Sequence, residues 1–146
     1  MRNILARTLV IALALAPMPA LADPLRTLEP LMEVFAADGD SPGWDVAGIR
    51  CAGLLYAQES WRQDHGGSGP GRKLLASAAT GLEQAVQHRV GLGKSLTKAT
   101  LSVEDDLHRV HALYLARFKA NDANGHPWSG DSLVKGDLGY CKAALR

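Results

Sequence analysis

Apolar residues recur at intervals of three and four along most of the chain, which is the spacing of one face of an α-helix. Beyond residue 22 this pattern is interrupted at clusters of Gly, Pro, Asn and Asp, which are typical of turns and loops. No stretch alternates apolar and polar positions for long enough to predict a strand. We therefore expect an all-α protein, a small antiparallel bundle of four to five helices.

The predicted segments differ in how clearly they begin. The first carries Leu25 to Phe35 with Thr27 as its N-cap, because Pro30 is tolerated only in the first turn of a helix. The fourth has the clearest start, since Ser102-Val-Glu-Asp105 resembles a capping box, with aspartate in place of the preferred Glu or Gln. The last begins near Asp131. The apolar positions of the five segments fall within residues 25–35, 46–61, 75–93, 103–118 and 133–145.

The beginning of the chain has a different pattern. Arg2 and Arg7 come before or at the start of an apolar run, Leu9–Ala16, which Pro17 ends and Ala20–Ala22 follows. A basic region, a short apolar region and a cleavage site of small residues are the three parts of a secretory signal peptide. The apolar run is much shorter than the ~20 residues of a membrane-spanning helix. The sequence therefore predicts a signal peptide that is cleaved after Ala22.

Removal of residues 1–22 would leave residues 23–146 as one helical domain. Losing the two arginines of the signal peptide changes the formal net charge from +1 to −1, which gives no field to steer nucleic acid or an anionic membrane. Cys51 and Cys141, the two cysteines of the chain, would lie in an oxidising compartment and could pair. We expect a periplasmic or secreted protein with one disulfide, which joins the second helix to the last, and no membrane span in the mature chain.

One group of residues has the spacing of metal ligands. Glu104, His108 and His111 project within about 60° of one another around a helix axis. Two imidazoles and a carboxylate could hold zinc or copper, with His65 or His126 completing the set. The same spacing also fits an ordinary amphipathic helix, with Glu104 and His108 as an i,i+4 pair and His111 beside the apolar stripe. The structural role is favoured, and a metal-binding protein or metalloenzyme is the alternative.

Two of the three tryptophans, Trp44 and Trp128, stand in predicted loops among Gly and Pro. Such indoles either fold back over the ends of a bundle or form a surface for a partner. The loop 121–130, which also contains His126, is longer than an ordinary helix connection, and long loops often carry function. Trp44, His126 and Trp128 are therefore a candidate interaction surface, and the expected partner is another protein of the cell envelope.

The motifs of common catalysts are missing from the sequence. The cysteines are too far apart for haem attachment or a C-x-x-C redox pair, and no G-x-S-x-G stretch occurs. The small residues of the third segment favour tight helix packing over the cavity of a lipid carrier. We expect no cofactor and a non-enzymatic binding protein, immunity-like or related to envelope stress. Periplasmic immunity proteins and acid-stress chaperones share this general architecture, although no motif of either is present.

Overall fold

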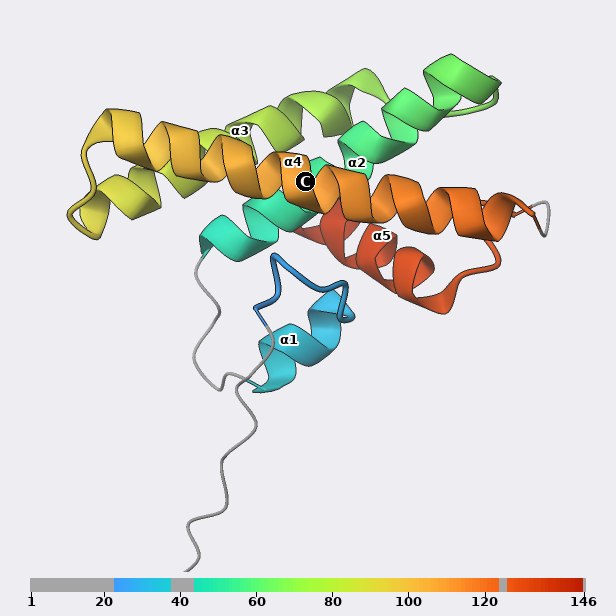
Figure 1. Ribbon diagram of the computed structural model, residues 1–146, viewed down its shortest axis with the longest axis horizontal. Helices are drawn as coiled ribbons and strands as arrows, with labels where there is room; N and C mark the ends of the chain where they lie inside the picture. Colours follow the sequence, from blue (N-terminus) through green and yellow to red (C-terminus); the bar gives the residue numbers. More distant parts are fainter. Residues whose placement is uncertain (1–22, 38–43, 124–125, 146) are drawn as a thin grey trace, which may run out of the picture.

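The computed structural model describes residues 23–37, 44–123 and 126–145, and within these ranges it is an all-α bundle without strands (Figure 1). The predicted signal peptide lies outside the described residues. The central helix is α2, which contacts α3 and α4 and also α5, while α1 lies against α5. None of the helices in the described part is long and apolar enough to cross a bilayer. The helices are α1 (Leu31–Ala37), α2 (Trp44–His65), α3 (Arg72–Gly91), α4 (Leu96–Asp122) and α5 (Ser132–Ala144).

Glycines let α2 lie very close to its two long neighbours. A Cβ atom on Gly48 would stand 2.6 Å from the backbone oxygen of Gly81 in α3, and one on Gly53 would stand 2.5 Å from Val110 Cγ1 in α4. Any side chain at these positions would force the helices apart, since contacts this short do not occur between packed atoms. The small-residue face predicted for the third segment is used in the same way, because Ala78 and Ala85 are fully buried.

The first helix starts later than predicted. Thr27 does not cap it; α1 begins at Leu31. Asp23 organises a separate turn instead, because its Oδ1 accepts a hydrogen bond from Leu25 N and its backbone oxygen accepts one from Thr27 N. Pro30 therefore precedes the helix, where its missing N–H costs no hydrogen bond. Leu25 is still buried, so its apolar character indicated burial correctly but not helix.

The fourth helix starts earlier than predicted, so the capping box at Ser102 is wrong. The N-cap of α4 is Ser95, whose hydroxyl accepts a hydrogen bond from a backbone N–H of the first turn. Gly93, with φ of +92°, has already reversed the chain at this point. Ser102 lies in the second turn, where its hydroxyl accepts a hydrogen bond of 2.9 Å from Arg89 in α3. The first turn of α4 has one small core residue, Ala99, which is fully buried, while Leu96 is exposed, so the start of the helix had no large buried residue to mark it.

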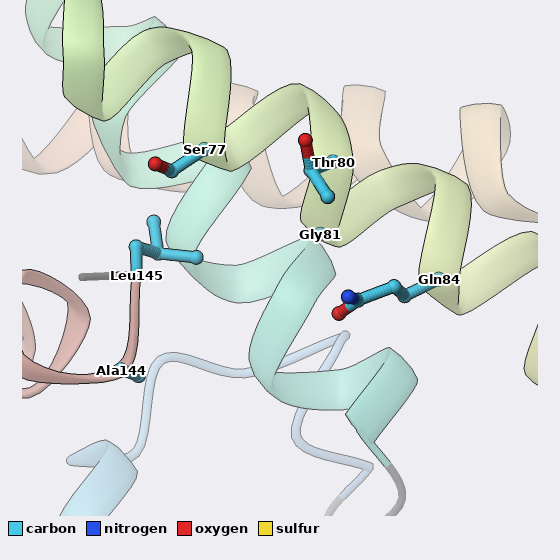
Figure 2. A pocket seen from close by; sticks show the side chains of 6 residues that line it. All are labelled: Ser77, Thr80, Gly81, Gln84, Ala144 and Leu145. Atoms are coloured by element: carbon cyan, nitrogen blue, oxygen red, sulfur yellow. The ribbon is translucent and has the colours of Figure 1, made fainter.

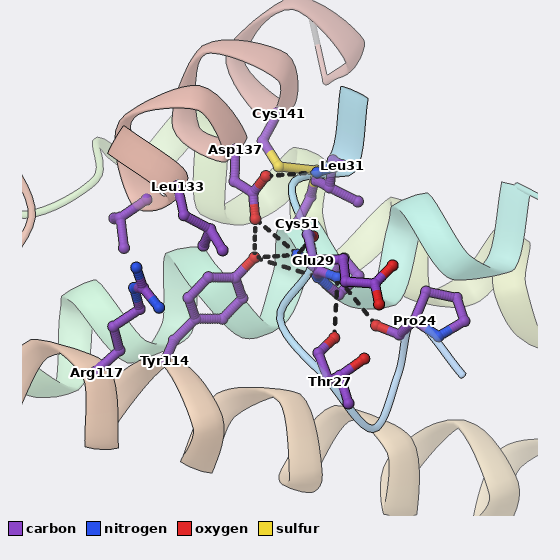
Figure 3. Close-up of polar contacts among 12 residues, drawn as sticks. Pro24, Thr27, Glu29, Leu31, Cys51, Tyr114, Arg117, Leu133, Asp137 and Cys141 are labelled. Carbon is purple, nitrogen blue, oxygen red and sulfur yellow. Dashed lines mark hydrogen bonds and ion pairs between the residues drawn. A yellow bond between two sulfur atoms is a disulfide. The ribbon is translucent and has the colours of Figure 1, made fainter. Parts of the chain in front are cut away.

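A buried ion pair joins three helices at the centre of the bundle (Figure 3). Arg50 of α2 and Asp137 of α5 are 0% and 1% exposed, and the distance from Arg50 Nη2 to Asp137 Oδ2 is 2.7 Å. The hydroxyl of Tyr114 in α4 donates to the same oxygen over 2.5 Å. Burial raises the pKa of Tyr114; Arg50 opposes this effect and Asp137 adds to it. The tyrosine is therefore a neutral hydrogen-bond donor at ordinary pH.

The same pair holds the segment before α1. Arg50 donates to the backbone oxygens of Pro24 and Glu29 over 2.9 and 2.8 Å, and Asp137 Oδ1 accepts a hydrogen bond of 2.8 Å from Leu31 N. These bonds provide partners for the polar atoms of both buried side chains, which would otherwise be costly to remove from water. The position of residues 24–31 thus depends on the charged side chains of Arg50 in α2 and Asp137 in α5.

The predicted disulfide is confirmed. Cys51 and Cys141 are bonded and fully buried, with a Cα–Cα distance of 5.4 Å. The bond joins α2 to α5, as the sequence indicated, and closes a loop across a sequence separation of 90 residues. In the chain-entropy model a loop of that length stabilises the fold by roughly 4–5 kcal/mol. Trp61 of α2 is also buried.

We predict that removing either member of the buried pair strongly destabilises the fold. Asp137→Leu should lower the free energy of unfolding by about 3–5 kcal/mol, because it leaves the guanidinium of Arg50 buried without its counter-charge. Urea unfolding followed by circular dichroism measures this change. The double variant Arg50→Met/Asp137→Leu should recover only part of the loss, because the backbone groups that the pair binds, such as Leu31 N, stay unpaired.

A matched control for this prediction is Arg62→Met. Arg62 lies on the same helix, but its side chain is 40% exposed and pairs with Glu59 near the surface. Exposed ion pairs contribute little to stability. The Arg62 variant should therefore unfold close to the wild type, and equal losses for Arg62→Met and Asp137→Leu would contradict the assigned role of the buried pair.

Candidate functional site

A groove of about 310 Å³ opens between α2, the α2–α3 loop and α5, and Trp128 forms part of its wall. We call it the Trp128 groove. Its apolar lining comes from three helices and from the turn that connects α4 to α5. One charged residue, Lys142, is among the described lining residues, and the amide of Gln58 adds a second polar group. The lining residues are Leu55, Gln58, Ser68, Gly69, Pro70, Gly71, Leu74, Trp128, Leu138 and Lys142.

The glycine-rich loop forms the rim of the Trp128 groove because glycines allow it to turn and to lie against α2. Gly66 and Gly67 have φ values of +77° and +90°, which side-chain-bearing residues rarely adopt. A Cβ atom on Gly69 would stand 2.7 Å from Arg62 Cδ and 2.9 Å from Glu59 Oε2. The loop therefore packs on the ion pair between Glu59 and Arg62, and its backbone faces the groove.

Aromatic packing positions Trp128 in the wall of the groove. Its ring lies edge-on to Phe118 of α4, with the ring centroids 5.6 Å apart. Phe118 is fully buried and lies edge-on to Trp61, which in turn stacks on His65 at 3.9 Å. The indole of Trp128 remains half-buried. One part of it therefore belongs to the core, and another part is available at the groove.

A polar cluster fixes the turn that carries Trp128. Asp131 accepts hydrogen bonds from Arg117 over 2.5 Å and from Asn121 over 2.7 Å, and Asn121 also donates to the backbone oxygen of Pro127. The carboxylate of Asp131 is also the N-cap of α5, as the predicted start of that helix required. Burial alone would raise the pKa of Asp131, but the hydrogen bonds from Arg117 and Asn121 outweigh burial and lower it to about 2.

The three residues predicted as an interaction surface have different surroundings. Trp128 lines the groove, and His126 is exposed two residues earlier in the same turn. Trp44 is the first residue of α2, but its side chain lies outside the described part of the structure. The structure therefore brings the loop 126–130 to a recessed surface and adds residues that the sequence pattern did not single out, such as Gln58 and Lys142.

The possible metal ligands of α4 have separate surroundings. Glu104 and His108 are exposed, whereas His111 is half-buried and its Nε2 lies 3.0 Å from Ser60 Oγ in α2. Burial lowers the pKa of His111, and the nearby His108 lowers it further. Across residues 23–37, 44–123 and 126–145, no three His, Cys, Asp or Glu side chains are grouped so that they could hold a metal ion. The metal-binding alternative therefore rests on sequence spacing alone.

A second hollow, of about 190 Å³, lies where the end of α5 meets α3 (Figure 2). It is lined by Ser77, Thr80 and Gln84 of α3, and Leu145 points toward it from the other side. Gly81 forms its base, at the close contact with Gly48. This hollow is smaller than the Trp128 groove, and its lining contains neither a charge nor an aromatic ring.

Comparison with known proteins gives no relative. No family model matches the chain, and neither the curated proteins nor the solved structures contain a match. The function of the protein is therefore inferred from its own residues and their geometry.

Sequence reasoning missed the most buried charges of the protein. Arg50 lies between Ile49 and Gly53 on the apolar side of α2, and Asp137 lies three residues after Val134 on that of α5. A charged residue inside an apolar stripe signals a buried pair. The signal does not identify the partner, because Arg50 and Asp137 are 87 positions apart.

We predict that the negative charge of Asp131 stabilises the turn of the Trp128 groove. Asp131→Asn keeps a helix-capping side chain but loses the charge, and it should lower the free energy of unfolding at about pH 7 by roughly 2 kcal/mol. Because the pKa of Asp131 is lowered in the folded state, its contribution is present above the ordinary pKa and is lost as pH falls toward about 2. Urea unfolding at several pH values should therefore show the two proteins converging in acid.

Asp122→Asn is the control, because Asp122 is an exposed carboxylate at the end of the neighbouring α4. It should match the wild type at every pH. A constant difference between Asp131→Asn and wild type down to acid pH would show that the charge of Asp131 does not stabilise the turn.

Proposed function

We propose that this chain is an exported, disulfide-linked binding protein that holds a segment of another envelope protein in the Trp128 groove and acts without catalysis. The observation that carries the proposal is the groove itself, which combines leucine side chains and an indole with polar groups and the ammonium of Lys142. Half-buried aromatic residues in recessed surfaces are frequent anchors of protein interfaces. An immunity-like or envelope-stress role is the kind of activity that such a protein would perform.

The lining indicates which partner segment would fit. Leu74 and Leu138, both half-buried, offer contacts to an apolar side chain, and the glycine-rich rim offers backbone groups to an extended peptide. Lys142 is a cation at the same groove and would favour a carboxylate beside that apolar side chain. The proposed ligand is therefore a peptide segment with an apolar anchor next to an acidic residue or a C-terminus.

Two features support export. Residues 1–22 have the three parts of a signal peptide, and Asp23, the first residue after the predicted cleavage site, already makes hydrogen bonds within the fold. Pro24, the next residue, binds Arg50. The buried disulfide is also the kind of bond that persists in an oxidising compartment. A protein that folds from Asp23 onward and forms this bond fits the periplasm or the cell exterior.

Export predicts a defined mass for the isolated protein. The form in the envelope or medium should begin at Asp23 and should have two hydrogens fewer than its reduced form, because Cys51 and Cys141 are bonded. Intact mass spectrometry with and without reductant measures both features. Replacing Ala20 and Ala22 by Phe should block processing, because the cleavage site requires small residues. A full-length mass or alkylated cysteines without reductant would contradict export.

Binding at the Trp128 groove can be tested by photo-crosslinking in the cells that make the protein. A photoreactive residue at Ser68, on the groove rim, should give a discrete adduct with another protein, whereas one at Gln87, on the exposed side of α3, should not. Lys142→Glu should reduce the Ser68 adduct about tenfold or more, because it places a negative charge next to the acidic ligand. Lys142→Arg should retain it. Equal adducts at Ser68 and Gln87, or no effect of Lys142→Glu, would refute groove binding.

A further inference from the structure

The end of the α3–α4 hairpin exposes large apolar side chains. Leu92, Leu96 and Leu101 are 70%, 61% and 60% exposed, although apolar residues elsewhere in the bundle are mostly buried. They lie within residues 91–101, which we call the α3–α4 tip. Figure 1 shows this turn, in yellow, projecting past the start of α2 at one end of the molecule. The core of the protein therefore does not account for these leucines.

The leucines of the α3–α4 tip point in different directions. Leu96 and Leu101 are five positions apart on α4, which separates them by about 140° around the helix axis and about 7.5 Å along it. Leu92 precedes both in the turn. A flat protein surface could contact one side of such a tip, whereas a medium that surrounds the tip contacts all sides. The apolar boundary of a lipid bilayer is such a medium, and its usual penetration depth of about 5–10 Å matches the tip.

The charge of the tip is positive, although the net charge of the chain is close to zero. Lys94 and Lys98 are exposed within it, and the sequence contains no Asp or Glu between Glu83 and Glu104. Glu83 lies about 12 Å along α3 from the turn, whereas Glu104 and Asp105 follow Leu101 within about one helical turn, and Asp105 is paired with Arg109. Leu92 and Lys94 also line a shallow cavity that contains four carboxylates. Each of these is paired with an arginine, namely Asp23 with Arg26, Asp45 with Arg89, Asp105 with Arg109, and Asp106 with both Arg89 and Arg109.

The backbone of the turn also suits a partly apolar environment. Lys94 N donates to the backbone oxygen of Arg89, and Gly93 N donates to that of Val90, which together form a Schellman motif. Leu92 N donates to the backbone oxygen of His88. Because these three N–H groups are already bonded within the protein, they would lose no hydrogen bond on leaving water.

We infer that the α3–α4 tip docks on an anionic lipid bilayer. The three leucines enter the boundary between headgroups and acyl chains, and Lys94 and Lys98 contact the anionic headgroups. Trp128 packs on Phe118, which lies 22 residues after Leu96, so this wall of the groove is about 33 Å from the start of α4 along the helix. A protein docked in this way would keep the groove accessible, and the docking does not depend on what the groove binds.

Vesicle flotation tests the docking. The oxidised protein isolated from the envelope or medium, which should begin at Asp23, should float with phosphatidylglycerol-containing vesicles and much less with pure phosphatidylcholine vesicles. The triple variant Leu92→Ser/Leu96→Ser/Leu101→Ser should lose about tenfold or more of its partitioning, because it removes the inserted apolar surface. Lys94→Gln/Lys98→Gln should lose about tenfold and most of the lipid selectivity.

Met32→Ser is the matched control, because Met32 is also a large exposed apolar residue, 63% accessible, but lies on α1. It should float like the wild type, and all variants should keep the wild-type melting temperature because the changed side chains are exposed. Equal flotation of all variants would overturn the inference and place the binding elsewhere on the protein. Concentration-dependent self-association without vesicles that the leucine variant abolishes would also overturn it, because the tip would then be a protein interface.

Discussion

The buried pair of Arg50 and Asp137 is the interaction on which the rest of the arrangement depends. Two charges can leave water only if nearly all their hydrogen-bonding atoms find partners, and here those partners come from α2, α4, α5 and the segment before α1. The requirement fixes where these elements meet. The disulfide lies next to the ion pair, because Cys51 follows Arg50 in α2 and Cys141 lies one helical turn after Asp137 in α5. A covalent bond and an ionic network thus join the same two helices at one place.

This concentration of links matters because α5 is poorly able to hold itself. It has 13 residues, and Gly136 and Gly139 within it have open space around them, so they reduce helix propensity without providing a close contact. Asp131 fixes its start, and Asp137 and Cys141 fix its middle and end. The same helix supplies Leu138 and Lys142 to the Trp128 groove. The α5 wall of the groove is therefore held by the helix cap, the ion pair and the disulfide, and not by helix propensity.

The sequence predicted the helices and their staple much better than the polar interactions between them. Apolar spacing and turn residues were sufficient for the five helices, and two lone cysteines after a signal-like segment were sufficient for the disulfide. The apolar spacing gave wrong predictions where an apolar residue is buried outside a helix or exposed within one. Leu25 is buried outside a helix, and Leu96 and Leu101 are exposed within one. The partner of Arg50 could not be predicted because the pairing depends on how α2 and α5 pack, which no local pattern encodes.

The length of α4 separates two surfaces with different chemistry. Its core face, from Ala99 through Val110 to Phe118, packs against the bundle, and the turn beyond its C-terminal end carries Trp128 into the groove. In its first two turns only one side of the helix is packed: Ala99 and Val103 are buried, whereas Leu96 and Leu101 are exposed. Single exposed apolar residues are common on protein surfaces, but three leucines with two lysines and no acidic residue in one turn region form a local composition that the fold does not require. An external contact explains that composition, whereas internal packing does not.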